Sequence, residues 1–528
     1  MSAISSDAAT FRTAFIVLLA GTIVRLGLAV LLDPGVDEAY AMAVATQWQL
    51  SWFDHPPMAF WWVKAMHDLA APLFGEPVPT FVLRLPFVLA FTVTCAVMFH
   101  LTCRLWGARS GLWALVALTL APFFLLSAGS WMVPDGPLLL FLALTARVLA
   151  ELLFFSPAPE GARERRLWIV AGVTLGLAGL SKYHAALFSF GVLVFVLATN
   201  HRSRLTAPAP WLGVVIAGLV ASPVLVWNAN HDWVSFLFQS SRGMGTDGIN
   251  WSGLGRAAFG QAAYLGPWTL IGALIALVSL LRTDRTIAGP NAFLLALSLP
   301  SIILFTAVPL WGGSALPHWQ MPGWLFLLPI LGRAIADSET RCGNAYRRAR
   351  GFAVAGATLL ALAIGSVMAF RVVPPSSDAI GRLGIGSFLE ESVTWRGLAA
   401  GLSERGLLAA TSPADAQQRR PLVVAFRWIE AARVAEALGS RATVAVFGND
   451  PRGFAFLADP ATWLGRDVLL IGRPKTFARG LDAARPLFSR IELQTPIAVK
   501  VGEFTLFEAQ VAIGRNLTSA YPLPYPRR

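Results

Sequence analysis

Residues 33–86 read DPGVDEAYAMAVATQWQLSWFDHPPMAFWWVKAMHDLAAPLFGEPVPTFVLRLP, and this stretch separates two apolar segments of the chain. Asp37 and Glu38 follow the first of these segments almost directly. The apolar spacing over residues 39–44 predicts an amphipathic helix after the acidic pair. A connection of about 50 residues is too long to be a simple turn. The stretch is therefore expected to be folded and to lie at a membrane interface, where its tryptophans are favoured.

The rest of the chain is apolar enough to cross a membrane many times. Of its 528 residues, 55% are hydrophobic and only 14% are charged, whereas soluble domains carry about 25% charged residues. A membrane span needs roughly 20 mostly apolar residues. By that criterion we predict about eleven spans, near residues 13–32, 85–103, 111–130, 137–155, 168–181, 184–199, 210–227, 262–281, 291–310, 320–335 and 351–370. The first is interpreted as a retained span and not as a removed signal peptide, and 168–181 with 184–199 as two short spans or one broken hairpin.

The net charge of +12 sets the orientation of these spans and does not indicate nucleic acid binding. Basic residues cluster in alternate loops, which we place in the cytoplasm: Arg104 and Arg109; Arg163, Arg165 and Arg166; Arg202 and Arg204; Arg282 and Arg285; Arg341, Arg347, Arg348 and Arg350. The outward loops are then 33–80, 131–136, 181–184, 228–261 and 311–319. This predicts a cytoplasmic N-terminus and an outward C-terminus.

Composition changes after residue 373. Residues 374–528 contain no apolar run of span length, but short β-like runs occur at 421–426, 442–447 and 467–472. Helical apolar spacing over 428–438 lies between the first two runs, and strand, helix and strand at this spacing predict a small α/β domain. The predicted organisation is a polytopic α-helical transmembrane catalytic domain, 1–373, with a large first outward loop, 33–80, and a soluble periplasmic α/β domain, 374–528.

Acidic residues on the outward side are the first candidates for chemistry. Asp37, with Glu38 beside it, is either a solvated loop residue or a general base whose partial desolvation raises its pKa. Asp135 lies in a short turn between two spans and is either a helix N-cap or a second functional acid. The predicted topology puts Asp37 and Asp135 on one face, so they could line one cavity.

Basic, aromatic and amide residues gather on the same face. Arg84 and Lys182 lie at span ends, where a charge either snorkels to the headgroups or binds a partner such as phosphate. Segments 227–236 and 317–322 suit either an aromatic belt or sugar binding. The histidines lack HxxxH or HExxH spacing, so a divalent metal has no support from ligand spacing.

Several motifs together resemble one family. They are DEAY at 37–40, WFDHPP at 52–57, RLP at 84–86, PDGPL at 134–138, SKY at 181–183 and WN at 227–228. Over roughly residues 10–330 the chain resembles the dolichyl-phosphate-mannose–protein mannosyltransferase family in its bacterial branch. That branch includes the lipid A aminoarabinose transferases and the galacturonosyl transferases of lipopolysaccharide core.

The resemblance implies a C-type glycosyltransferase fold in the bacterial inner membrane, with the active site facing the periplasm. It implies an inverting transfer of a sugar from a polyprenyl-phosphate donor to a hydroxyl of an envelope glycolipid, lipopolysaccharide or protein. The expected catalytic residues are Asp37, Glu38 and Asp135, with Arg84 and Lys182 at the donor phosphate. The expected substrate-binding residues are Tyr40, Asp54, His55, Tyr183, Trp227, Asn228 and His318.

Independent of the family, the chain has neither a P-loop nor a GxGxxG after a strand, so a membrane-borne donor is the more sensible expectation. The alternatives are a transporter or flippase of a lipid-linked sugar, for which intramembrane charges also fit, and a lectin-like membrane sensor. Asp37→Asn distinguishes them, because only an enzyme should lose turnover and keep donor binding.

Overall fold

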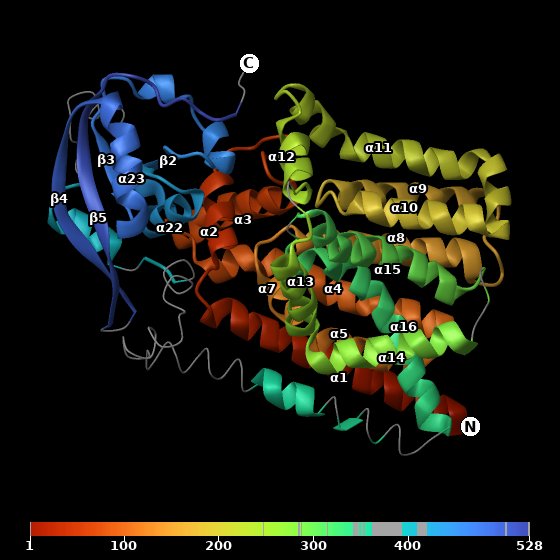
Figure 1. The fold of residues 1–528 in the computed structure, drawn as a ribbon. Helices are drawn as coiled ribbons and strands as arrows, with labels where there is room; N and C mark the ends of the chain where they lie inside the picture. The colour runs from red at the N-terminus through yellow and green to blue at the C-terminus, as the bar shows by residue number, and fades with distance from the viewer. Residues whose placement is uncertain are drawn as a thin grey trace.

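The computed structural model describes residues 2–245, 248–283, 286, 288–313, 315–341, 347, 350, 351, 354–361, 393–395, 397–408, 420–501 and 504–525. Two parts are visible in Figure 1, a long helical bundle and a smaller part built around a sheet at one end of it. Helices α2 and α3 lie at the end of the bundle that meets the sheet part. The predicted domain boundary at 373/374 lies outside the described residues.

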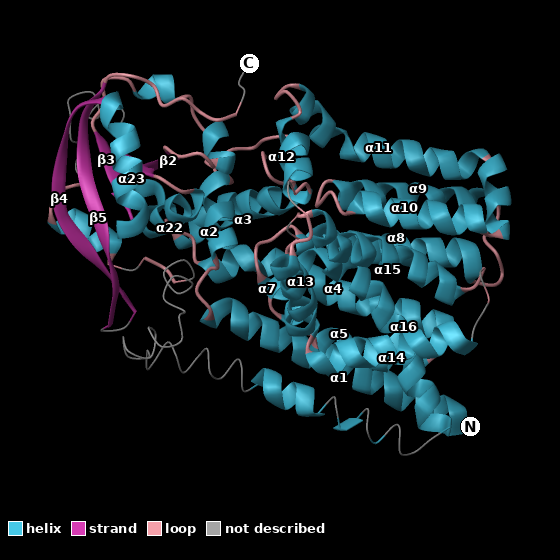
Figure 2. Ribbon diagram, in the orientation of Figure 1, coloured by secondary structure: helices cyan, strands magenta, loops and turns pink. Residues whose placement is uncertain are grey.

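Helices make up the bundle, and Figure 2 shows that the strands are confined to the other part. In chain order the bundle contains α1 (Ser2–Leu31), α2 (Val36–Val44), α3 (Met58–Phe74), α4 (Thr80–Trp106), α5 (Ala108–Leu120), α6 (Pro122–Leu125), α7 (Ser127–Ser130), α8 (Asp135–Phe154), α9 (Gly161–Gly179), α10 (Ala185–Ala198), η1 (Asn200–Thr206), α11 (Pro208–Ala229), α12 (Val234–Gly243), α13 (Trp251–Leu265), α14 (Pro267–Thr283), α15 (Pro290–Ala307), η2 (Val308–Trp311), η3 (Pro317–Gln320) and α16 (Met321–Arg341).

Five of these helices are individually long and apolar enough to cross a membrane, namely Asp7–Leu31, Thr80–Trp106, Asp135–Phe154, Pro208–Ala229 and Pro290–Trp311. Three bent pairs raise the number to as many as eight, with bends of 82° between α5 and α6–α7, 104° between α10 and η1, and 102° between α13 and α14. The chain is therefore a multi-pass membrane protein.

The remaining predicted spans do not pass the same test of length and apolar composition, or are only partly described. Helices α9 and α16 cover two of them, with 19 and 21 residues and charged residues near one end. Only residues 351 and 354–361 of the last segment are described, so the count of about eleven stays a prediction. The segments at 168–181 and 184–199 form two separate helices, α9 and α10.

One apolar core runs through the bundle. Phe91 on α4, Leu142 on α8, Phe293 on α15 and Phe326 on α16 are each at most 1% exposed and belong to the same cluster. Large side chains on the outer faces remain exposed, as lipid-facing residues of a membrane bundle should be. At the turn into α5, Gly107 ends α4 with φ of 91°, a conformation that favours glycine.

The other part contains α20 (Leu398–Glu404), β1 (Leu422–Ala425), α22 (Trp428–Leu438), η4 (Gly439–Arg441), β2 (Thr443–Val446), η5 (Arg452–Phe456), η6 (Pro460–Trp463), β3 (Val468–Gly472), α23 (Pro474–Ala484), η7 (Arg485–Leu487), β4 (Phe488–Val501) and β5 (Phe504–Leu517). The strand order is β2-β1-β3-β5-β4. β1 pairs in parallel with β2 and β3, as in Leu422 opposite Thr443, while β5 pairs antiparallel with β3 and β4.

The strand–helix–strand prediction at 421–447 is confirmed by β1, α22 and β2, and the run at 467–472 by β3. All residues of β1 and β3 are buried, because apolar clusters cover both faces of the sheet. The long strands β4 and β5 were not predicted from the sequence. Beyond β5, Tyr525 stacks on Phe53 of the first loop with ring centroids 4.2 Å apart.

Candidate functional site

Helix α2 carries two neighbouring acidic residues that differ in solvent exposure. Asp37 is exposed, whereas Glu38 is completely buried. The protein around Asp37 limits the solvation of its charge and so raises its pKa; the negative charges of Asp54, Glu38 and Asp135 raise it further, while Arg452 opposes them. The amphipathic helix predicted after the acidic pair is present as residues 36–44. Asp37 is thus an accessible carboxyl group whose pKa is shifted in the direction a general base needs.

Glu38 is held by Arg84 in a buried ion pair. The Arg84 Nε and Nη2 atoms donate to the two carboxylate oxygens at 2.8 and 2.6 Å. The remaining Arg84 donors bind the backbone oxygens of Ala29 and Leu32 at 2.8 and 2.7 Å, and of Asp33 at 3.2 Å. Every N–H of Arg84 therefore has a protein acceptor, and both side chains are 0% exposed.

This arrangement fixes α2 against the end of α1 and the start of α4. Glu38 also accepts backbone hydrogen bonds from Gly35 at 2.8 Å and Met132 at 3.1 Å. Neither Glu38 nor Arg84 has an exposed side-chain surface, or an uncommitted hydrogen-bond donor or acceptor, with which to bind a substrate. The geometry favours positioning roles over the predicted catalytic role of Glu38 and the predicted phosphate-binding role of Arg84.

Asp54 lies in a buried chain of hydrogen bonds. Tyr40 donates its hydroxyl to Asp54 Oδ1 at 2.8 Å, and the backbone N–H of Gly453 donates to that hydroxyl at 2.9 Å. Gln239 on α12 binds the Asp54 backbone oxygen at 2.5 Å. Burial raises the pKa of Asp54, and Arg452, at 4.0 Å, lowers it. Tyr40 and Asp54, both predicted to bind substrate, connect the first loop to α12 and η5.

Asp135 and Lys182 form a second buried pair. The Lys182 ammonium donates to both Asp135 oxygens at 2.9 and 3.0 Å, and the side chains are only 4% and 6% exposed. Asp135 opens α8, and Lys182 lies in the turn between α9 and α10. The two predicted site residues are therefore brought together, and the charge of Asp135 also reaches Asp37. Part of the Lys182 charge is already balanced by Asp135.

Two histidines next to these pairs are neutral. Burial lowers the pKa of His55 to about 3 and that of His318 to about 3, and the positive charge of Lys182 lowers both further. His55 Nδ1 is buried without a hydrogen-bond partner among the described residues. An unpaired buried nitrogen is costly unless a water or ligand contacts it. His55 therefore remains a good candidate for substrate contact.

The predicted pair Trp227–Asn228 is mainly internal. Asn228 is 0% exposed, donates to the Val224 oxygen at 3.0 Å and accepts from the Ser235 N–H at 3.2 Å. The Trp227 ring stacks on His231 with centroids 3.9 Å apart. These contacts end α11 and begin α12, so they position the connection between these two helices. Tyr183 packs on Phe236 of α12 with centroids 5.3 Å apart.

Two arginines at the site were missed by sequence reasoning. Arg242, at the end of α12, stacks over Trp319 at 4.9 Å and Phe238 at 5.6 Å. Within the part of the chain that the structure describes, its guanidinium has no hydrogen-bonding or ion-pair partner. Arg452 of η5 stacks over Trp428 at 3.8 Å. A cation in an outward loop, against the charge bias of such loops, was the available signal for Arg242; the sequence offered none for Arg452.

Arg242 and Arg452 are close enough to repel each other. Burial lowers the pKa of Arg242, and the charge of Arg452 lowers it further, while Asp54 and Asp37 oppose this. Both guanidinium groups approach the same Phe238 ring, at 5.6 and 5.9 Å. An anion bound here would relieve the repulsion and satisfy the open donors of Arg242.

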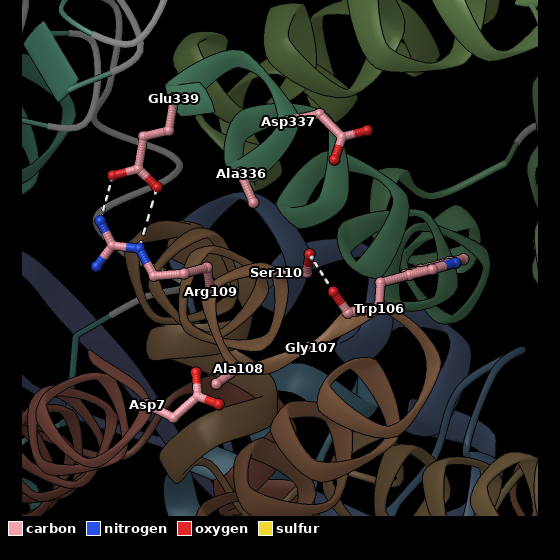
Figure 3. A pocket seen from close by; sticks show the side chains of 9 residues that line it. All are labelled: Asp7, Trp106, Gly107, Ala108, Arg109, Ser110, Ala336, Asp337 and Glu339. Carbon is pink, nitrogen blue, oxygen red and sulfur yellow. Dashed lines mark hydrogen bonds and ion pairs between the residues drawn. The ribbon is translucent and has the colours of Figure 1, made fainter. Parts of the chain in front are cut away.

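A separate pocket lies far along the bundle, near the N-terminus. It has a volume of about 520 Å³ and is lined by Asp7, Trp106, Gly107, Ala108, Arg109, Ser110, Ala336, Asp337 and Glu339. Figure 3 shows Arg109 paired with Glu339, both among the residues that line this pocket. None of the predicted site residues lines it. The ion pair connects α5 to α16, and we assign the pocket no catalytic part.

Among the described residues, no group of three or more His, Cys, Asp or Glu side chains is placed to hold a metal ion. The carboxylates nearest the site are instead engaged by Arg84, Lys182, Tyr40 and Arg452. Fold and site together define a multi-pass membrane protein with an acidic, arginine-flanked centre at the end of its bundle that faces the sheet part.

Comparison with known proteins agrees with this description. Residues 54–227 match the family model of the dolichyl-phosphate-mannose–protein mannosyltransferases. Lipid A galacturonosyltransferase RgtD of Rhizobium johnstonii is 27% identical over 279 residues, which are 51% of this chain and 54% of that protein. The chain thus matches about half the length of this curated relative.

Solved structures show the same fold. ArnT from Cupriavidus metallidurans bound to undecaprenyl phosphate superposes with a TM-score of 0.58 at 16% identity, covering 94% of this chain and 97% of ArnT. The apo form of ArnT gives a TM-score of 0.56 at 16% identity, over 97% and 98% of the two chains. The predicted resemblance to the bacterial branch of the mannosyltransferase family is confirmed, and RgtD is a glycosyltransferase by name.

Proposed function

We propose that this protein is an inverting glycosyltransferase that moves a sugar from a polyprenyl-phosphate donor to a hydroxyl of an envelope acceptor on the periplasmic side of the inner membrane. One observation carries the proposal above the others. Asp37 is an exposed carboxyl group with a raised pKa, and its charge acts on Arg242, whose guanidinium has no hydrogen-bonding or ion-pair partner among the described residues.

The mechanism follows from these two groups. Asp37 takes the proton from the acceptor hydroxyl as its oxygen forms a bond to the anomeric carbon of the donor. The bond from that carbon to the phosphate oxygen breaks, and its electron pair leaves with the phosphate. The leaving group departs as an anion, so it needs positive charge more than a proton donor. Arg242 is proposed to supply that charge, with Lys182, which is paired with Asp135, as a second cation.

The other motifs around Asp37 are proposed to hold it in place. The Glu38–Arg84 pair fixes the first turn of α2, and the Tyr40–Asp54 hydrogen bond fixes its buried side. A misplaced base loses much of its effect, because general base catalysis depends on hydrogen-bond reach to the proton it removes. His55 and His318, both neutral, are proposed to bind sugar hydroxyls.

Two relatives suggest the substrate class. RgtD is a lipid A galacturonosyltransferase by name, and ArnT has been crystallised with undecaprenyl phosphate. We therefore propose undecaprenyl phosphate or a similar polyprenyl phosphate as the carrier, and a lipid A-type glycolipid as the first acceptor to test. The sheet part, next to Asp54 and Tyr40, is proposed to contribute to acceptor choice.

The test compares envelope glycolipids from cells with and without the gene by mass spectrometry. The proposal expects a glycolipid that is heavier by one sugar only when the gene is present, and expects Asp37→Asn to remove it. In reconstituted vesicles, the purified protein should release polyprenyl phosphate when donor and acceptor are both supplied. Transfer of intact donor between leaflets without any glycosylated product would instead identify a flippase and refute the proposal.

A further inference from the structure

A short segment of the sheet part, Asp450–Phe456, lies against the first loop. Gly453 donates its N–H to the Tyr40 hydroxyl at 2.9 Å. Phe454 packs edge-on against Tyr40, with centroids 5.9 Å apart, and Phe456 stacks on Phe53 at 5.5 Å. Since Tyr40 in turn holds Asp54, this segment is in direct contact with α2 at a residue three positions after Asp37.

Arg452 adopts an uncommon conformation in this segment. Its φ is 48°, a left-handed value that costs free energy for any residue other than glycine. The conformation aims the guanidinium over the Trp428 ring at 3.8 Å and toward Asp54 Oδ2 at 4.0 Å. Its Nε also lies 3.4 Å from Asp450 Oδ2. A strained backbone that directs a cation to a cluster of acids indicates that the placement is functional.

The charges around Arg452 show what it balances. Glu38 and Asp135 have their own cations, Arg84 and Lys182. Asp37 has no ion-pair partner within 4.0 Å among the described residues, and Asp54 has only Arg452. Arg452 is the largest contribution that lowers the pKa of Asp37 and of Asp54, against the loss of solvation by surrounding protein that raises both. The titratable and charged groups that face it are Asp37, Tyr40, Asp54, His55, Arg242, Asp450 and Tyr525.

We propose that Arg452 is a positioning residue of the catalytic centre, supplied by the sheet part, which provides the positive charge that balances Asp37 and Asp54. The contact between segment Asp450–Phe456 and the first loop would then decide whether Asp37 is charged and ready to act as a base. The inference rests on the proposed function for its catalytic meaning, but the electrostatic link can be measured without any substrate.

The direct test is an infrared titration of the full-length protein in lipid nanodiscs, with Asp37→Asn as the subtraction that isolates the carboxyl signal of Asp37. Loss of a nearby opposite charge shifts a carboxyl pKa by about 1 unit or more. Arg452→Gln should therefore move the Asp37 midpoint upward by about 1 pH unit. Arg452→Lys should keep it near the wild-type position. Arg479→Gln, which removes an exposed arginine of α23 from the same part of the protein, should leave it unchanged.

A midpoint that stays in place in Arg452→Gln overturns the inference, whatever happens to activity. If Arg452→Gln does not fold, Gly453→Ala gives the second test. A Cβ there would lie 2.5 Å from the Tyr40 hydroxyl and push the segment away from the first loop while keeping the arginine. We expect the Asp37 midpoint to rise in this variant too, and an unchanged midpoint counts against the proposal.

Activity then separates the two claims. With donor and acceptor, Arg452→Gln should lower turnover and shift the acid limb of the pH–rate profile upward, and Arg452→Lys should restore the limb. Equal turnover losses in both variants with an unshifted limb would show a merely structural role. A shifted infrared midpoint in a protein without any transferase activity would support the charge link and refute the proposed function instead.

Discussion

Removing Arg84 should mainly lower the stability of the folded protein, and any loss of donor binding should follow from that instability. Arg84→Met deletes five hydrogen bonds and leaves the Glu38 carboxylate buried with only two backbone donors, Gly35 and Met132. Breaking a buried ion pair by removing one partner costs about 3–5 kcal/mol. The exposed pair Lys64–Asp68 is a matched control, because surface pairs contribute only about 0–1 kcal/mol.

The assay is thermal unfolding of the purified full-length chain in detergent. Arg84→Met should lower the unfolding midpoint far more than Asp68→Asn does. The double variant Glu38→Gln/Arg84→Met should be less destabilised than the sum of the single variants, because it no longer buries an unpaired charge. An Arg84→Met protein with wild-type stability that fails to bind polyprenyl phosphate would refute this reasoning and restore Arg84 as a phosphate ligand.

Three further predictions concern the charges at the site. The raised pKa of Asp37, above its ordinary 3.8, means that turnover should fall as the pH drops through a midpoint above that value, because the base must be deprotonated to act; a pH–rate profile without this limb would contradict the assignment. Arg242→Gln should weaken donor binding about tenfold or more through the loss of a charged contact, as measured by binding of a fluorescent polyprenyl phosphate, whereas Arg256→Gln, on the exposed side of α13, should bind as the wild type does. Asp135→Asn and Lys182→Met should each lower the unfolding midpoint, since each alone leaves a buried charge unpaired. The double variant should lower it by less than the sum of the two single effects, and an additive double variant would contradict this prediction.

Local sequence signals located much of the bundle and the start of the site. Of the eleven segments predicted from apolar runs, the first ten fall on helices, and most of the eleventh, 351–370, lies outside the described residues. A membrane span requires a continuous apolar run, which is readable without tertiary structure. The acidic pair followed by helical spacing predicted a helix, and α2 covers those residues. Asp135 and Lys182 were both chosen as site residues, and the structure places them in contact.

Long-range pairing was not readable from the sequence. Glu38 and Arg84, 46 positions apart, were assigned to catalysis and to phosphate, yet they bind each other. Local spacing places residues on a helix face or a loop, but it does not reveal which charge will neutralise which. For the same reason Lys182 was considered free for phosphate, although Asp135 already binds it.

Arg452 is the clearest case of what local patterns miss. It lies in a short 3₁₀ segment of a different part of the protein, 398 positions from Asp54 (452 − 54), and reaches the site only because β1, α22 and β2 carry it there. Strands β4 and β5 were also missed, because a long pair with a register shift in its middle lacks a clean alternation. Residues that connect two parts of a fold become visible only in three dimensions.

The central claim is that Asp37 is the base that drives transfer, and a single-turnover experiment tests it most directly. Purified wild-type protein and Asp37→Asn are each loaded with radiolabelled polyprenyl-phosphate sugar and then mixed with acceptor. We predict equal donor loading and a transfer rate reduced by at least about a hundredfold in Asp37→Asn, in line with the contribution of a positioned base. Transfer by Asp37→Asn at the wild-type rate, with the donor equally bound, would contradict the account.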